Sequence, residues 1–253
     1  MVLLTGMSCG TLPFSVNQAT LSAEVTPPTS ATPEPTATPT IVWFPPTATF
    51  TPFPTSTLIP PTPEMRPGVS KILLQDNFTE STPWTLHSGG NGRISLGKEE
   101  LTIAIQEDKA YLMSFRNGPT LSDFYAEITV NPNLCQDKDE YGLLVRVTSA
   151  ENYYRYALSC DGQVRVDRIL SGSASSPQPW MDSGMIPIGS PSISRLAVWA
   201  VGAEMRFFAN DTYLFTVRDP AIPAGTLGVF ARSSGGHALT VNFSNLIINE
   251  LSH

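Results

Sequence analysis

The chain has 253 residues, and its 22 acidic and 15 basic side chains give a formal net charge of −7. Nucleic-acid binding needs a basic face, so this acidic composition excludes nucleic acid as a partner. The sequence also has no run of about 20 apolar residues, the length that a transmembrane helix requires. We therefore expect a folded part without a membrane-spanning helix.

Residues 1–24 begin with MVLLTGMSCGTL, a short apolar run followed by small residues and Cys9. This start resembles the end of a bacterial lipoprotein signal, which implies that Cys9 is lipidated, anchors the chain to a membrane and places the rest outside the cell. The basic region of such a signal is absent, its apolar region is short, and Gly6 stands where the motif has an aliphatic residue. We interpret residues 1–24 as a truncated signal, and an incidental cysteine in a disordered N-terminus is the alternative.

Residues 25–68 form a Pro/Thr-rich segment, and 14 of the 23 prolines of the chain lie at or before Pro67. Proline fixes φ and has no amide hydrogen, so this composition favours neither a helix nor a sheet. We predict a disordered stalk, which in polyproline II geometry would reach on the order of 120 Å. The folded domain then comprises residues 69–253.

The folded domain consists of short runs in which apolar and polar residues alternate, separated by turn residues. Apart from residues 141–170, the predicted strands are 71–78, 93–96, 100–105, 110–115, 122–130, 193–201, 203–209, 212–217, 226–232 and 237–251. Residues 171–180, with the sequence SGSASSPQPW, are predicted as a loop that carries Trp180. No segment of ten or more residues has helical periodicity with caps. About a dozen antiparallel strands predict an all-β sandwich.

Residues 141–170 are predicted as three consecutive strands, with a three-residue turn at Cys160–Gly162 between the last two. This turn places Leu158 opposite Val164, Tyr156 opposite Val166, and Arg155 opposite Asp167. A two-residue turn would instead oppose two arginines, which is unfavourable. One face is then apolar and carries Leu143, Val145, Val147, Tyr154, Tyr156 and Leu158. The opposite, polar face carries Arg146, Thr148, Tyr153, Arg155, Arg165 and Asp167.

Cys135 and Cys160 come near each other in this register, because Tyr141 lies near Cys160 across the strand pair. A disulfide requires Cα atoms less than about 7 Å apart. It would contribute roughly 3 kcal/mol to stability by closing the intervening loop, and it would place the domain outside the cytoplasm. Two unrelated thiols are the alternative.

Several short sequence motifs occur in the same order as in a known superfamily. They are Asp76-Asn77-Phe78, Tyr141–Arg146, Asn152-Tyr153-Tyr154, Asp161-Gly162, Arg195–Val198, Phe208–Asp211, Gly225–Phe230 and Val241–Leu246. Over residues 71–251 the chain resembles the concanavalin-A-like lectin and glucanase jelly roll, in particular its laminin-G-like, 3-keto-disaccharide hydrolase-like version. The resemblance implies a jelly-roll β-sandwich and a function among lectins, hydrolases and structural modules.

Catalytic chemistry has no identified constellation in the sequence. Retaining glucanases of this superfamily need two carboxylates about 5 Å apart, and no strand carries acidic residues in alternation. The run Asp137-Lys138-Asp139-Glu140 offers oxygen ligands of the kind that calcium binds, and a solvated charged turn is the alternative. The three histidines are isolated and match no zinc spacing. We therefore expect no cofactor, and the sequence leaves open whether the protein is an enzyme while favouring one that is not.

Sugar-binding sites combine aromatic side chains with charged or amide groups. The polar face offers this combination in Arg146, Tyr153, Arg155, Arg165 and Asp167, on the sheet that is concave in the resembling family. The alternative is that the arginines only solubilise the sheet. We predict an exported protein that presents this module on its stalk and binds a glycan or another surface polymer. A glycoside hydrolase whose carboxylates meet only in the fold, and a purely structural envelope module, are the other hypotheses.

Overall fold

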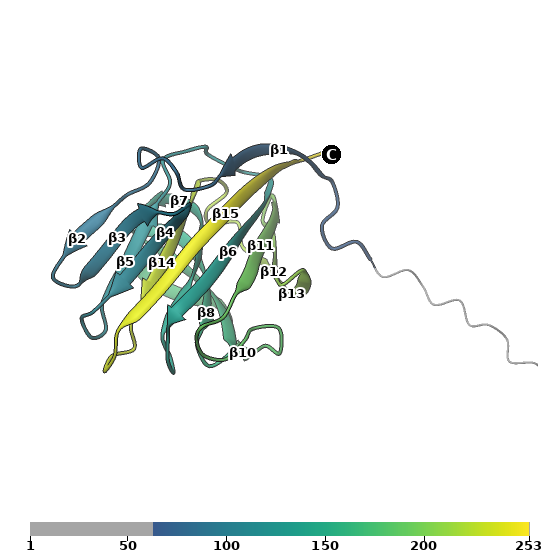
Figure 1. Cartoon of the computed structure of the whole chain (residues 1–253). Coiled ribbons are helices and arrows are strands. Elements are labelled where there is room, and N and C mark those ends of the chain that lie inside the picture. Colours follow the sequence, from purple (N-terminus) through teal and green to yellow (C-terminus); the bar gives the residue numbers. More distant parts are fainter. Residues whose placement is uncertain (1–62, 253) are drawn as a thin grey trace, which may run out of the picture. The chain divides into compact units, whose positions relative to one another are not determined.

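The computed structural model describes residues 63–252 of the chain (Figure 1). Cys9, the predicted signal and the predicted stalk up to residue 62 lie outside the described residues. The strands are β1 (Val69–Asp76), β2 (His87–Gly89), β3 (Gly92–Gly97), β4 (Glu100–Ile105), β5 (Tyr111–Phe115), β6 (Phe124–Leu134), β7 (Glu140–Ser149), β8 (Asn152–Ser159), β9 (Gln163–Leu170), β10 (Ser173–Asp182), β11 (Ser194–Val201), β12 (Glu204–Ala209), β13 (Thr212–Arg218), β14 (Thr226–Arg232) and β15 (Leu239–Leu251).

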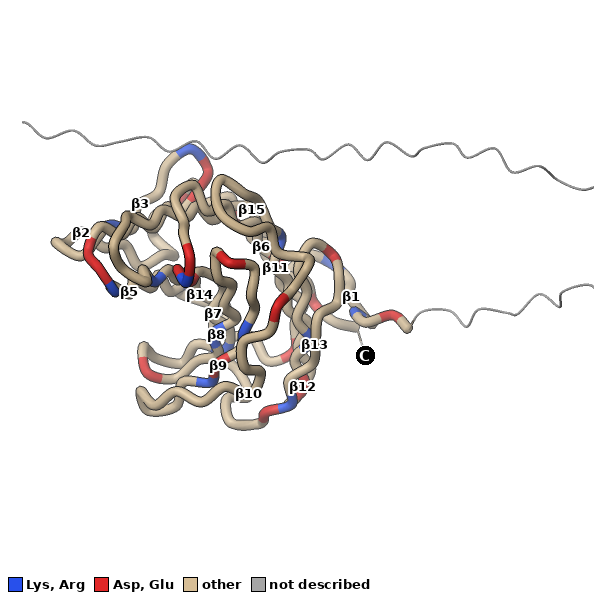
Figure 2. The backbone as a smooth tube through the Cα atoms, turned by 90° about the horizontal axis from the view of Figure 1, so that it is seen from below, with Lys and Arg blue, Asp and Glu red and all other residues tan. Residues whose placement is uncertain are grey.

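The strands form two antiparallel sheets. A nine-stranded sheet has the order β13-β12-β11-β6-β15-β4-β3-β2, with β1 added against β15, and a six-stranded sheet has the order β10-β9-β8-β7-β14-β5. Figure 2 shows the two layers, with β15, β6 and β11 in one and β14, β7, β8 and β9 in the other. Residues 63–252 contain no helix, so none in this part of the chain could cross a membrane. The predicted all-β sandwich is confirmed.

The core lies between the sheets, where the inward side chains of each strand alternate with outward ones. Tyr156 of β8 is fully buried there, with its ring edge-on to Phe207 at a centroid distance of 5.0 Å. Its hydroxyl donates a hydrogen bond of 3.2 Å to the carbonyl oxygen of Phe208 in the other sheet. The predicted apolar face of β8 is therefore the core face, and it joins the two layers.

The predicted pairing of β8 with β9 is confirmed in full. Leu158 pairs with Val164, Tyr156 with Val166, and Arg155 with Asp167. The turn between β8 and β9 therefore has three residues, as we predicted from the favourable pairing of Arg155 with Asp167.

The predicted faces at the end of β7 are wrong after Val145. A β-bulge shifts the register there, and Arg146 has a φ of 52°. Bulges insert an extra residue and change which way the following side chains point. As a result Val147 lies on the outer side with Leu144 and Tyr153, whereas Arg146 is fully buried.

Strand β10 was predicted as a loop, and this prediction is also wrong. It pairs with β9 over Ser173–Asp182, with register shifts on both sides of Gln178. Proline cannot donate to a sheet ladder, but an edge strand leaves one side unpaired and tolerates it. Pro177 and Pro179 therefore fit at this margin, where β10 is the last strand of its sheet.

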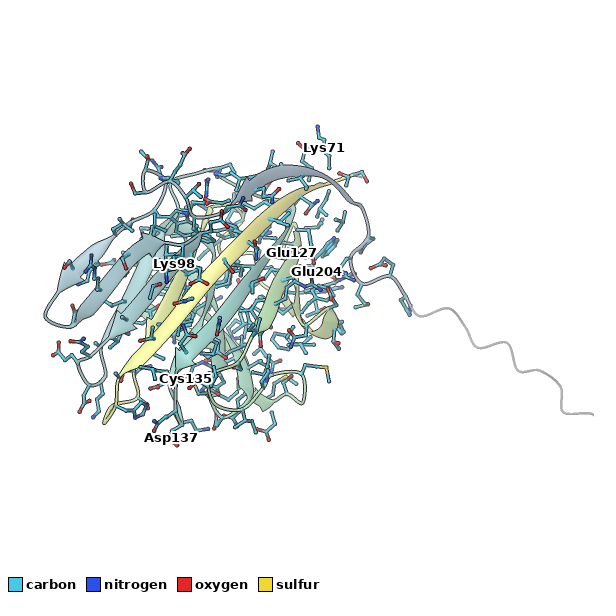
Figure 3. The ribbon with its side chains drawn as sticks, viewed as in Figure 1. Lys71, Lys98, Glu127, Cys135, Asp137 and Glu204 are labelled. Carbon is cyan, nitrogen blue, oxygen red and sulfur yellow. A yellow bond between two sulfur atoms is a disulfide. The ribbon has the colours of Figure 1, made fainter. Side chains whose placement is uncertain are left out.

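Cys135 and Cys160 form a buried disulfide with their Cα atoms 5.9 Å apart, as predicted. It joins the loop after β6 to the turn between β8 and β9. Figure 3 places Cys135 at the end of the sandwich where the charged loop with Asp137 also lies.

Residues 65–67, which the sequence analysis assigned to the stalk, pack on the outer side of the nine-stranded sheet. Trp199 Nε1 donates a hydrogen bond of 2.9 Å to the Pro67 carbonyl oxygen, and Met65 packs against the Trp199 cluster. The Arg66 guanidinium carbon lies 5.5 Å from the centre of the Phe208 ring. The packed domain therefore begins before residue 69.

Candidate functional site

The outer side of the six-stranded sheet, which we call the outer face, is opposite to the core. Its apolar side chains form a separate cluster from the core of the sandwich. Cross-strand pairing aligns Tyr111 with Arg232, Met113 with Phe230, and Phe115 with Gly228. The side chains of this face are Tyr111, Met113, Phe115, Glu140, Leu144, Val147, Tyr153, Arg155, Arg165, Asp167, Ile169, Trp180, Phe230 and Arg232.

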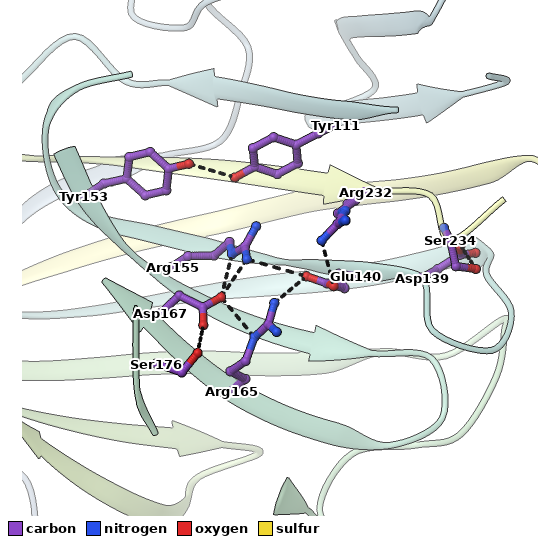
Figure 4. A network of polar contacts seen from close by, with 10 residues as sticks. All are labelled: Tyr111, Asp139, Glu140, Tyr153, Arg155, Arg165, Asp167, Ser176, Arg232 and Ser234. Carbon is purple, nitrogen blue, oxygen red and sulfur yellow. Dashed lines mark hydrogen bonds and ion pairs between the residues drawn. The ribbon is translucent and has the colours of Figure 1, made fainter. Parts of the chain in front are cut away.

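Five charged side chains meet on the outer face (Figure 4). Asp167 Oδ2 lies 2.6 Å from Arg155 Nη2 and 2.9 Å from Arg165 Nε. Glu140 Oε2 lies 3.1 Å from Arg165 Nη2, and Glu140 Oε1 lies 3.4 Å from Arg232 Nη1. We call these five residues the charged cluster. It has three cations and two anions, so one positive charge is in excess.

The charged cluster differs in exposure from one member to the next. The side chain of Asp167 is only 2% exposed, and its Oδ1 accepts a hydrogen bond of 2.5 Å from Ser176 Oγ. The side chain of Arg232 is 46% exposed. The buried ion pairs therefore hold the cluster together, and Arg232 is its exposed cation.

Aromatic rings line the charged cluster. The Arg155 guanidinium carbon lies 5.6 Å from the centre of the Tyr111 ring and 5.5 Å from that of Phe230. The Arg165 guanidinium carbon lies 4.4 Å from the centre of the Trp180 ring. All three distances are within the range of cation–π contacts. The outer face therefore combines planar rings with guanidinium groups.

Burial shifts the ionisation of this face. It raises the pKa of the Tyr111 phenol, and the neighbouring Tyr153 hydroxyl at 3.3 Å adds to the rise. Burial alone would lower the pKa of Arg155, but Tyr111, Asp167 and Glu140 outweigh it and raise that pKa. At neutral pH Tyr111 is therefore a protonated phenol and Arg155 a charged guanidinium, and both groups can donate hydrogen bonds.

Four of the five predicted ligand-binding residues lie together on this face, namely Tyr153, Arg155, Arg165 and Asp167. Arg146 does not, and its placement on the polar face is corrected. Its guanidinium points away from the outer face and donates to the carbonyl oxygens of Ser122, Gly202 and Ile222 at 3.0, 2.7 and 3.2 Å. Arg146 therefore ties a strand of one sheet to the turn between β11 and β12 of the other.

Three members of the face come from distant strands and were not predicted, namely Tyr111, Phe230 and Arg232. Trp180 was not predicted either, because its strand β10, which follows β9 directly, has the composition of a loop. Alternation along residues 111–115 and 226–232 would have placed Tyr111 with Phe115 and Phe230 with Arg232 on common faces. No sequence signal, however, indicated that β14 lies between β7 and β5.

The acidic run at 137–140 does not converge on one point. Lys138 forms an ion pair with Asp161, and Glu140 belongs to the charged cluster. Asp139 is fully buried and accepts hydrogen bonds of 2.7 Å from the Ser234 amide and from His237 Nε2. Asp137 is exposed at the tip of the loop (Figure 3). The buried member of the run therefore joins two loops.

No strand of the described domain holds the paired free carboxylates of a glucanase. Glu140 and Asp167 share Arg165 on one face, but their oxygens are taken by three guanidinium groups and one hydroxyl. Retaining hydrolysis needs one carboxylate free to attack and another to protonate the leaving group. Both carboxylates are therefore engaged in ion pairs within the charged cluster.

No protein-family model and no curated protein matches the sequence. Solved structures do match. Carbohydrate-binding module CBM66 from Bacillus subtilis has a TM-score of 0.52 and 18% identity, covering 66% of this chain and 96% of that one. A Bacillus subtilis protein of unknown function with a galectin-like fold has a TM-score of 0.55 and 10% identity, covering 73% and 99%. The Bacteroides ovatus mixed-linkage glucan PUL GH16 protein, in complex with a G4G4G3G product, has a TM-score of 0.54 and 7% identity, covering 70% and 100%.

These likenesses concern the fold, since the identities are low. The chain therefore has a jelly-roll β-sandwich fold that it shares with these proteins.

Proposed function

We propose that the outer face binds a glycan without cleaving it. The observation that carries this proposal is the stacking of Arg165 on Trp180 and of Arg155 on Tyr111, next to the exposed guanidinium of Arg232. Planar rings pack on the C–H faces of sugars, and guanidinium groups donate to their hydroxyls. The presence of a carbohydrate-binding module among proteins of similar fold supports the same class of ligand.

The placement of the N-terminal segment supports display of this face. Residues 65–67 pack on the nine-stranded sheet, on the opposite side of the sandwich from the outer face. The segment that precedes the domain is therefore attached on the side away from the outer face.

We further propose that Cys9 anchors the chain to a membrane outside the cell and that the Pro/Thr-rich segment holds the domain away from it. The motif around Cys9 and the disulfide, which is typical of oxidising compartments, support this proposal. Labelled palmitate should be incorporated by the protein expressed in a bacterium with its upstream codons and not by Cys9→Ala. Equal labelling of both proteins, or of neither, would contradict the anchor.

Glycan binding should depend on Trp180. We expect Trp180→Ala to lower the affinity for a glycan that the wild type binds by at least about fivefold, because truncating a central aromatic side chain costs roughly 1 kcal/mol or more. A glycan array identifies the ligand, and titration calorimetry measures the affinity. Tyr213→Ala is the matched control, since Tyr213 is an exposed aromatic residue on the other sheet.

Two outcomes would contradict this proposal. The first is that the wild type binds no glycan on the array, and the second is that Trp180→Ala and Tyr213→Ala bind equally well.

Glycoside hydrolysis is the second candidate function, favoured by the presence of Glu140 and Asp167 on one face. New reducing ends released from the bound glycan by the wild type, and not by Glu140→Gln, would establish hydrolysis instead.

A further inference from the structure

A second feature adjoins the outer face where β5 ends and β14 begins. A cavity of about 480 Å³ lies there, lined by three short segments, residues 82–85, 115–117 and 147–150, and by Thr226. We call it the end pocket. Ligand pockets for small molecules typically have volumes of about 300–1,000 Å³, so a sugar ring fits within it. Nothing in the charged cluster lines this pocket.

The end pocket has an apolar floor that continues the outer face. Phe115 and Val147 line the pocket and also belong to the apolar cluster of the outer face. Gly228 pairs with Phe115, and a Cβ atom added there would lie 3.2 Å from the Phe115 ring and 2.7 Å from the Ser114 carbonyl oxygen. Because Gly228 of β14 has no side chain, the Phe115 ring of β5 has room to pack against this strand.

The walls of the end pocket are held in place by backbone hydrogen bonds. The Thr85 amide donates to the Phe115 carbonyl oxygen at 3.0 Å, and the Asn117 amide donates to the Pro83 carbonyl oxygen at 2.6 Å. Thr226 Oγ1 donates to the Arg116 carbonyl oxygen at 2.6 Å. A preformed pocket loses little conformational entropy when it binds a ligand.

Apart from Arg116, the polar groups of the end pocket are neutral. Hydroxyls of Thr82 and Thr148 line it, and the exposed side-chain amide of Asn117 forms no hydrogen bond with any residue between 63 and 252. Its one charged lining residue, Arg116, is compensated, because Arg116 Nε lies 2.9 Å from Asp76 Oδ2 and both side chains are largely buried. Hydroxyls and an amide over an aromatic floor match an uncharged sugar ring.

We propose that the end pocket is a subsite for one neutral ring of the glycan. The glycan then runs along the strands from the charged cluster to this pocket. This inference rests on the proposed function of the outer face. From Tyr111 to Phe115 the face extends four residues along β5, about 13 Å at roughly 3.3 Å per residue. The ligand must therefore be an oligosaccharide whose rings are recognised differently at its two ends.

The test uses neutral tetrasaccharides, namely cello-, xylo-, laminari- and fructo-oligosaccharides, with the full chain. For a probe that the wild type binds, we expect Thr82→Trp, which fills the pocket, to lower the affinity at least tenfold. Asn117→Ala should lower it about fivefold, as expected for one lost hydrogen bond. Asn133→Ala is the matched control, because Asn133 is exposed on β6 of the other sheet. Thermal unfolding of each variant shows that it folds.

The outcomes separate this inference from the proposed function. If Trp180→Ala weakens binding and neither Thr82→Trp nor Asn117→Ala does, the outer face binds glycan and the end pocket is not a subsite. If the wild type binds none of the neutral probes but binds a glycan on the array, the neutral subsite is overturned and the proposed function stands; if it binds neither, both proposals are overturned. A tetrauronate whose affinity falls as much on Thr82→Trp as that of the neutral probes would overturn the assignment of a neutral ring.

Discussion

Arg146→Ala should lower the free energy of unfolding by about 4 kcal/mol. The guanidinium is fully buried and donates to the carbonyl oxygens of Ser122, Gly202 and Ile222, which lie outside its own sheet. Removing it breaks three hydrogen bonds, one buried and two partly buried. A hydrogen bond to a charged group contributes about 1.5–3 kcal/mol. Burial lowers the pKa of Arg146, so relief from desolvation offsets part of this loss.

Urea unfolding measures this loss, with Arg93→Ala as the control because Arg93 is exposed on β3. Arg146→Lys should fall between the wild type and Arg146→Ala, since an ammonium group keeps the charge but cannot reach all three carbonyl oxygens. Equal stability of Arg146→Ala and Arg93→Ala would show that Arg146 does not join the sheets. Because of this role, a loss of glycan binding in Arg146→Ala would report unfolding rather than a lost contact.

Arg146 also shows where sequence reasoning fails in this fold. The hairpin of β8 and β9 could be predicted because its register depends on neighbouring residues, a short turn and one pair of opposite charges. The bulge in β7 has no such signal. Arg146 adopts a positive φ without being glycine, asparagine or aspartate, and apolar and polar residues alternate through the bulge as in a regular strand. Contacts with the other sheet decide its direction.

The candidate site follows the same division. Tyr153, Arg155, Arg165 and Asp167 could be predicted together because one hairpin carries them. Their partners Tyr111 and Arg232 come from β5 and β14, which join β7 only through the order of strands in the sheet. That order depends on long-range pairing, which no local pattern indicates. The Ser/Pro-rich composition of β10 is typical of a loop, and for this reason the strand that carries Trp180 was not predicted.

Asp167→Ala should lower the free energy of unfolding by about 3–5 kcal/mol, because removing one partner of a buried ion pair leaves the other charge uncompensated. Here two guanidinium groups lose their partner, at 2.6 Å from Arg155 and 2.9 Å from Arg165. Asp182→Ala, on the neighbouring strand and exposed, is the control in urea unfolding.

The double variant Asp167→Ala/Arg155→Met decides what the charged cluster is for. Replacing both partners of a buried ion pair by apolar groups is often neutral for stability, so we expect this variant to recover at least half of the loss in Asp167→Ala. Its glycan affinity should be lower than that of the wild type, because the guanidinium between Tyr111 and Phe230 is gone. A double variant as unstable as Asp167→Ala would make the ion pair a structural requirement, and one that binds glycan like the wild type would remove Arg155 from the site. Recovery of stability without recovery of binding is the pattern that a binding face predicts, since apolar groups can replace the buried charges in packing but cannot donate hydrogen bonds to a sugar.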